Sequence, residues 1–174
     1  MQTAWRLVRR GEVVCADCLG QLLIHSCYQR HCRDESGERQ HGWVAQGHCV
    51  ACNSYPALIP EFIMPHKHYK AEVIEGVVTS SEEGVSIEQK GGCAADVSTM
   101  RRWIKQFKER GTLAVGWLLS TLITLHDIHV STIELRGLAL LKQLARLLRE
   151  YGATGGGIIG RVNIILTTQN CGFL

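Results

Sequence analysis

Four cysteines in two closely spaced pairs are the residues of this sequence best suited to chemistry. Cys15 and Cys18 form one Cys-x-x-Cys pair, and Cys49 and Cys52 form another after thirty intervening residues. Tetrahedral zinc takes four thiolates at about 2.3 Å, and each pair can present two of them from one short turn. Four protein ligands leave no open position for an activated water. The spacing therefore predicts one structural zinc ion held by these four cysteines.

Each pair also needs a residue that tolerates a left-handed backbone just after its second cysteine. Gly20 and Asn53 follow the two pairs, and these residue types adopt that conformation at least cost. Accidental spacing, or disulfide formation, is the simpler alternative. Cys27 and Cys32 inside the loop offer a second or exchanged ligand pair, and the candidate histidine ligands nearby are His25, His31, His41 and His48.

The loop between the pairs must bring them together, and its pattern predicts a β-hairpin. An apolar start at Leu22, turn residues at 34–37 and a returning stretch at 40–46 outline two strands. A hairpin with a metal-binding pair at each end is the outline of a zinc ribbon. We expect this ribbon to occupy residues 1–55. A proline-rich connector, residues 56–66, follows and is expected to be extended and packed.

Residues 67–111 carry the pattern of two helices. Apolar residues at three- and four-residue steps predict a helix from about Lys67 to Ser80 and a second over 97–110, capped by Asp96 or Ser98 and stopped by Gly111. The second helix is basic on its outer face, like the recognition helix of a helix-turn-helix. An ordinary surface helix is the alternative. The predicted DNA-contacting residues are Ser98, Thr99, Arg101, Arg102, Lys105 and Lys108.

Residues 112–174 are expected to form a C-terminal helical region. The apolar run 113–125 is shorter than the 20 or so residues that span a membrane, and it predicts a separate buried helix. A capping-box pattern at 131–134 predicts a long helix to Tyr151, with Ile133 and Leu138 on its buried face. His126 and His129 are weak metal-ligand candidates. Residues 158–168 predict a last apolar helix or strand.

Composition indicates one or two small soluble domains of the α+β class, a β zinc ribbon followed by helices. The 174 residues are 45% hydrophobic and 20% charged. Eight cysteines without a recognisable signal peptide favour metal binding and reduced thiols in the cytoplasm. The net charge of +3 is small, but positive charge gathers at 101–110, where it would attract a phosphate backbone.

Together these motifs resemble a bacterial family of unknown function, common in Firmicutes, that pairs an N-terminal zinc ribbon with a transposase-like helix-turn-helix. The resemblance implies an accessory or regulator of a mobile element that binds double-stranded DNA in the nucleoid, with a transposase or as a homodimer. Gly91 and Gly92 depart from an orthodox helix-turn-helix. The stretches that carry the resemblance are the two cysteine pairs, residues 58–69 and 71–74, Cys93, residues 98–103 and the tail 172–174.

Catalysis is not expected from this sequence. Its carboxylates do not assemble into the spaced triad of a two-metal nuclease, and the His-x-Glu of the zinc deaminases is absent. Cys93 and Cys171 are expected to be inert thiols. One alternative of another class stays open, a zinc-ribbon adaptor that binds protein rather than DNA. Its docking or dimer face would be the apolar run 113–125 with the helix that follows.

Overall fold

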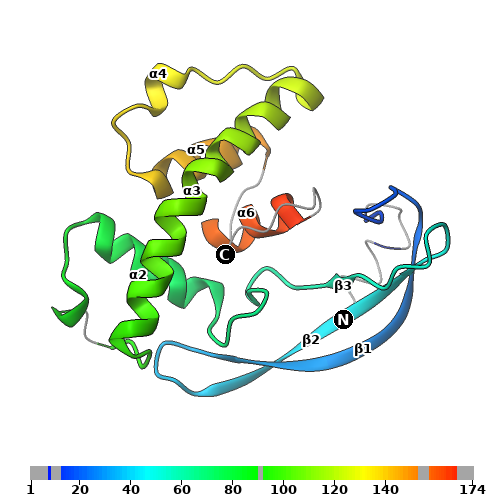
Figure 1. The fold of residues 1–174 in the computed structure, drawn as a ribbon, viewed down its shortest axis with the longest axis horizontal. Coiled ribbons are helices and arrows are strands. Elements are labelled where there is room, and N and C mark those ends of the chain that lie inside the picture. Colours follow the sequence, from blue (N-terminus) through cyan, green and yellow to red (C-terminus); the bar gives the residue numbers. More distant parts are fainter. Residues whose placement is uncertain (1–7, 9–12, 90–91, 153–156, 168–174) are drawn as a thin grey trace.

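The computed structural model shows a long β-hairpin lying beside a group of helices (Figure 1). It describes residue 8 and residues 13–89, 92–152 and 157–167. Strands β1 (Leu22–Arg33) and β2 (Arg39–Cys49) pair antiparallel, and the short β3 (Ala57–Leu58) adds to the other edge of β2. The expected α+β class and the predicted hairpin are therefore confirmed.

The two strands of the hairpin are paired along their whole length. Arg33 pairs with Arg39 next to the turn, and Leu22 pairs with Cys49 at the open end, with an irregularity between Ile24 and Ser26. The Asp34 carboxylate accepts hydrogen bonds from the side chains of Ser36 and Gln40 and from the backbone of Glu38, at 2.7–3.0 Å. These contacts hold the turn, because each satisfies a polar group that the change of chain direction exposes.

The connector after β3 packs against the protein, as expected. Ile63 and Met64 are buried. Beyond them the chain reaches the tip of the hairpin, where the backbone N–H of Arg33 donates to the carbonyl of His68 at 2.7 Å. The N–H of Lys70 in turn donates to the carbonyl of Arg33 at 3.0 Å. The tip of the ribbon is thus tied to the segment that leads into the first helix.

The helices form the larger core. They are α2 (Ala71–Glu82), the 3₁₀ turn η1 (Ile87–Gln89), α3 (Val97–His126), α4 (Thr132–Leu135), α5 (Leu140–Glu150) and α6 (Ile158–Thr167). Apolar residues of α2, α3, α5 and α6 make one continuous cluster, while the ribbon has two small clusters of its own. The last apolar segment, predicted as a helix or a strand, is the helix α6. None of the described helices combines the length and apolarity needed to cross a membrane.

Helix α2 begins at Ala71 rather than near Lys67, and two later helix boundaries also differ from the sequence predictions. Gly111 does not end α3, which is 30 residues long and continues through the segment expected to be a separate helix. Gly111 is instead a contact point, since a Cβ there would lie 2.5 Å from Leu140 Cδ2. The predicted helix from 131 to 151 is also wrong. It is interrupted after α4, where Gly137 has a φ of +85°.

This interruption changes which residues are buried. Ile133 and Leu138, expected on a buried face, are exposed. The connection between α2 and α3, residues 83–96, is also much longer than the three- or four-residue turn of a helix-turn-helix. The segment 113–125 is only half buried: Ala114, Leu118 and Leu122 point inward, and the opposite side of α3 faces solvent.

Candidate metal centre and basic surface

The two cysteine pairs adopt the same backbone turn. The N–H of Leu19 donates to the carbonyl of Cys15 at 2.9 Å, and the N–H of Asn53 donates to the carbonyl of Cys49 at the same distance. A second hydrogen bond closes each turn, from the N–H of its first cysteine to the carbonyl five residues on, again at 2.9 Å. Two equivalent knuckles therefore face each other at the base of the hairpin, and each presents two sulfurs.

The left-handed residues of these knuckles are Leu19 (φ 59°) and Asn53 (φ 58°). The prediction for Asn53 is confirmed, but the one for Gly20 is wrong, because the left-handed position lies one residue earlier. Gly20 is required for a different reason. A Cβ on it would lie 2.9 Å from the Ala51 Cβ and 3.2 Å from the sulfurs of Cys18 and Cys49. The first knuckle therefore carries a strained leucine and a glycine that makes room for sulfur.

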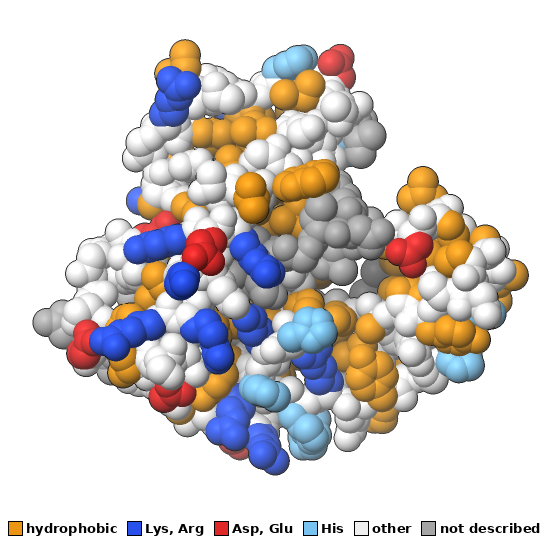
Figure 2. Space-filling model, viewed as in Figure 1, with side chains coloured by type: hydrophobic (Ala, Val, Ile, Leu, Met, Phe, Trp, Pro, Cys, Tyr) orange, Lys and Arg blue, Asp and Glu red, His pale blue; other side chains and the backbone are white. Residues whose placement is uncertain are grey.

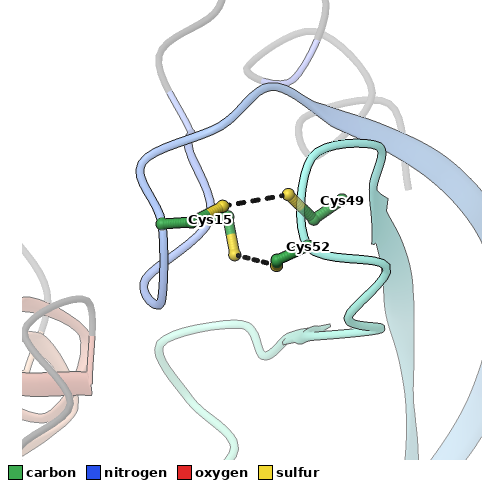
Figure 3. Close-up of side chains that lie close together, drawn as sticks. Cys15, Cys49 and Cys52 are labelled. Atoms are coloured by element: carbon green, nitrogen blue, oxygen red, sulfur yellow. Dashed lines mark hydrogen bonds between the residues drawn. The ribbon is translucent and has the colours of Figure 1, made fainter.

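The four sulfurs form one compact group (Figure 3). Cys15 Sγ lies 3.6 Å from Cys52 Sγ, Cys18 Sγ lies 3.4 Å from Cys49 Sγ, and all four atoms lie within 4.8 Å of one another. These separations far exceed the S–S bond of about 2.05 Å. They are close to the sulfur–sulfur distance of about 3.8 Å that tetrahedral coordination at about 2.3 Å requires. The four predicted ligands thus come together with a geometry that fits a metal ion.

Ser54 supports two of these thiols. Its hydroxyl lies 3.1 Å from Cys52 Sγ and 3.4 Å from Cys15 Sγ. The hydrogen bond from Ser54 is the largest influence on both groups, lowering the pKa of Cys15 to about 6 and lowering that of Cys52. Sequence reasoning missed this serine. Its position two residues after the last ligand was the only available signal.

The pKa of the Cys18 thiol is shifted in the opposite direction to the pKa values of Cys15 and Cys52. A hydrogen bond from the Gly20 backbone lowers the pKa of this thiol, but hydrogen bonds with the thiols of Cys49 and Cys52 raise it, to about 12 overall. The Cys18 thiol therefore holds its proton more tightly than the thiols of Cys15 and Cys52 do. Binding of a cation at the centre would displace that proton, because metal ligation requires thiolates.

The alternative metal ligands do not assemble. Within the described residues, the four-cysteine group is the only set of three or more candidate side chains close enough to share an ion. Cys27 and Cys32 are an odd number of residues apart in β1 and so point to opposite faces, and Cys32 is buried beside Val44 and Ile63. His129 contacts Asp127 at 3.6 Å without a further ligand group.

Cys93 is partly buried against the helical core, and Cys171 lies outside the described residues, as does the tail 172–174.

The first half of α3 has the predicted two-sided character. Met100, Trp103, Ile104 and Phe107 are buried. Asp96 caps the helix as predicted, accepting from the N–H of Thr99 at 3.0 Å and from its hydroxyl at 2.8 Å. The predicted DNA-contacting residues lie on the outer side or at the start of the helix: Ser98, Arg101, Arg102, Lys105 and Lys108 are exposed, and Thr99 is half-buried.

Four of these residues already form hydrogen bonds or ion pairs within the protein. Ser98 and Thr99 hydrogen-bond Asp96 through their hydroxyls. Arg101 pairs with Glu88 at 2.8 Å, and Lys105 lies 3.9 Å from Glu109. Exposed pairs of this kind contribute little and exchange readily with solvent.

Positive charge is concentrated where α3 meets the connector. Lys67 Nζ donates to Gln106 Oε1 at 2.6 Å. Burial lowers the pKa of Lys67, and the nearby cations Arg102 and Arg110 lower it further. Figure 2 shows Lys and Arg side chains gathered over this part of the molecule, with histidines beside them near the hairpin. The basic surface therefore extends beyond α3, which sequence reasoning did not anticipate.

The hairpin contributes two basic cross-strand pairs to this region. His31 lies opposite His41, and Arg33 lies opposite Arg39. Three of these four residues line a depression of about 390 Å³ together with two residues that follow the connector; the lining is His31, Arg33, Arg39, His68 and Tyr69. The signal in the sequence was a period of two, with basic residues at alternate positions on both sides of the turn.

A family model described as a domain of unknown function, DUF6431, matches residues 15–103. The matched segment begins at the first ligand cysteine, ends at Trp103 within α3, and covers slightly more than half of the 174 residues. It therefore includes both knuckles, the connector, α2 and the start of the basic helix. No curated protein and no solved structure matches the chain.

Proposed function

This chain belongs to the DUF6431 family, whose function is unknown, and we propose that it is a zinc-ribbon protein that binds double-stranded DNA. One observation carries the proposal: α3 turns Arg101, Arg102, Lys105 and Lys108 to solvent along one half of its length, over a buried apolar stripe. A helix of this kind presents cations at a spacing suited to a phosphate backbone while its other side holds it rigid.

Zinc is the ion we assign to the four-cysteine group. Four sulfurs in a compact arrangement suit a tetrahedral, borderline-soft cation, and the absence of a non-protein ligand position suits a structural role. Cys15, Cys18, Cys49 and Cys52 would hold the ion, and its binding free energy would be available to fold the small ribbon. In this proposal the ribbon takes no part in catalysis.

In this proposal, α2 and α3 act as a helix-turn-helix-like unit, with α3 in the major groove. The long connection between them means that the arrangement is not the orthodox motif. The family resemblance described from the sequence supports a role as an accessory or regulator of a mobile element. Both specific assignments depend on the more general proposal that the basic face of α3 binds duplex DNA.

Fluorescence anisotropy of a labelled mixed-sequence duplex tests this function. The zinc-loaded protein is titrated at several salt concentrations, beside the variant Arg101→Ala/Arg102→Ala. A charge-matched control, Arg136→Ala/Lys142→Ala, changes two exposed cations outside the proposed surface. We expect salt-dependent binding that weakens in the first variant and persists in the control. Equal affinity of the wild type and the first variant would refute the role of α3.

A second candidate function follows from the apolar side of the same helix. Leu113, Trp117 and Ile123 are exposed along the second half of α3, although they are large hydrophobic residues. Such a surface favours the adaptor alternative, in which this half docks a second copy of the chain or another protein. Analytical ultracentrifugation distinguishes the two. A stable dimer that is dispersed by Leu113→Gln/Trp117→Gln and ignores DNA would favour the adaptor.

A further inference from the structure

We infer that the tip of the ribbon is a phosphate-binding site, which takes a backbone phosphate of the same DNA that α3 contacts. We call its two cross-strand pairs, His31–His41 and Arg33–Arg39, the hairpin ladder. The inference rests on the proposed function for the source of the phosphate. The site itself is defined by side chains outside the metal centre and outside α3.

The ladder lies on one face of the hairpin. Residues two apart in a strand point to the same side, so His31 and Arg33 share a face with their partners in β2. The imidazole rings of His31 and His41 meet edge to face, with centroids 4.5 Å apart. The next pair along the same face adds Trp43, which is 45% exposed. Four nitrogen-bearing side chains and an aromatic ring thus occupy one continuous surface.

The two arginines occupy an arrangement that is unfavourable without an anion. Like charges directly opposite each other on paired strands destabilise a sheet. Within the described residues, neither Arg33 nor Arg39 forms an ion pair, and the nearby Asp34 carboxylate is taken up by the hydrogen bonds of the turn. A bound phosphate would offset the repulsion, since guanidinium groups match its oxygens in geometry and charge.

The segment between the connector and α2, residues 67–70, turns this pair of arginines into a concave site. His68 and Tyr69 lie against the ladder, because the backbone of Arg33 is hydrogen-bonded to His68 and to Lys70 on either side of Tyr69. The depression of about 390 Å³ is open to solvent and large enough for a phosphodiester group. Donors from two separate segments therefore converge on one opening.

Two further contacts place the site next to the basic half of α3. The carbonyl of Glu35 in the hairpin turn accepts from the N–H of Ala94, two residues before the helix cap, at 2.8 Å. Tyr69 packs edge to face on Trp103, with ring centroids 5.2 Å apart. Figure 1 shows the hairpin turn beside the start of α3. One nucleic-acid backbone can therefore reach both cationic surfaces.

The salt dependence of duplex binding tests the inference. The variant Arg33→Gln/Arg39→Gln is compared with the wild type and with Arg136→Gln/Lys142→Gln, which loses the same charge elsewhere. We expect the slope of log affinity against log salt to fall by about one in the ladder variant and to stay unchanged in the control. Zinc content and circular dichroism establish that each variant is folded. Arg39→Gln alone, at an exposed position, serves if the double variant does not fold.

A second measurement separates this inference from the proposed function. Imidazole NMR signals of His31, His41 and His68 are followed during titration with inorganic phosphate and with the duplex. Shifts with both ligands support the inference. An unchanged slope in the ladder variant, with normal duplex binding, overturns it and leaves the role of α3 standing. Shifts with phosphate but no duplex binding by the wild type would overturn DNA as the source. No response to either ligand would overturn both.

Discussion

The carboxylate of Glu75 in α2 accepts a hydrogen bond from the backbone N–H of Ile159, in the first turn of α6, at 3.0 Å. A second carboxylate of α2 does the same for α5, since both oxygens of Glu82 lie 3.3 Å from the N–H of Leu141. The first N–H groups of a helix have no partner within it, and its positive end favours an anion. Helix α2 therefore supplies the N-terminal partners of two later helices.

The position of Glu75 predicts how stability depends on pH. Burial raises the pKa of its carboxyl, although the Ile159 and Ile158 amides lower it. The folded protein therefore binds more protons at this group than the unfolded one, and its contribution to the free energy of unfolding falls as pH rises through the range just above the ordinary glutamate value. Glu75→Gln removes this fall.

Urea unfolding between pH 4 and pH 7.5 measures the effect. The advantage of the wild type over Glu75→Gln should shrink as pH rises. Glu72→Gln, at an exposed position of the same helix, is the control and should show no such trend. A wild-type advantage that grows with pH would mean that the helix N-terminus outweighs burial at this site.

The metal centre predicts one zinc ion per chain. Elemental analysis of the purified protein should give a ratio of about one, and X-ray absorption should show only sulfur neighbours at about 2.3 Å. Cys49→Ser should abolish tight binding and unfold the ribbon, because this buried thiol lies at the end of β2. Cys27→Ser, outside the cluster, should retain the ion. Zinc loss in both variants would contradict the ligand assignment.

Two helical glycines should respond to alanine in opposite directions. A Cβ at Gly160 in α6 would collide with the backbone carbonyl of Glu61 in the connector, whereas nothing lies within 4 Å of a Cβ at Gly116. We expect Gly160→Ala to cost about 1–3 kcal/mol of unfolding free energy, since a backbone group cannot turn aside. Gly116→Ala should add about 0.5–1 kcal/mol. Chemical denaturation measures both, and destabilisation by Gly116→Ala would be contrary to this packing.

The cap of α3 predicts a second pH effect, of opposite sign. Hydrogen bonds from Ser98 and Thr99 lower the pKa of Asp96 to about 2, from an unfolded value near 3.8. Its stabilisation is present above the unfolded value and is lost as pH falls toward 2. Asp96→Asn keeps an acceptor at the cap but not the charge. The difference in thermal midpoint between the wild type and Asp96→Asn, measured by circular dichroism at 222 nm, should therefore shrink as the pH is lowered. A difference that stays constant with pH would contradict this prediction.

Features fixed by neighbouring residues could be predicted from the sequence. Each Cys-x-x-Cys pair, the hairpin turn at Asp34 and the cap at Asp96 depend on residues a few positions apart. Gly111 shows where this reasoning fails. Glycine is a common helix stop, but here the space that it leaves is filled by Leu140 from α5, and the helix continues. Packing between distant segments overrode the local preference.

The basic surface shows the same limit. The cations of α3 follow one another in the sequence and were identified together. Arg33 and Arg39 become a pair only through the register of the hairpin, and His68 joins them only because the connector hydrogen-bonds to the tip. The sequence alone therefore presents His31 and His41 as metal-ligand candidates, although the register places them near the turn of the hairpin, at the end remote from the cysteines.

The double attachment of the hairpin has a mechanical consequence. A strand of twelve residues such as β1 reaches about 40 Å. A hairpin of that length, attached only at its cysteine end, would undergo large thermal motions at its turn. The hydrogen bonds of Arg33 with His68 and Lys70 give the hairpin a second support, opposite the cysteine group. Loss of either the cysteine group or these hydrogen bonds therefore leaves one end of the hairpin attached, whereas loss of both would let the hairpin move relative to the helices.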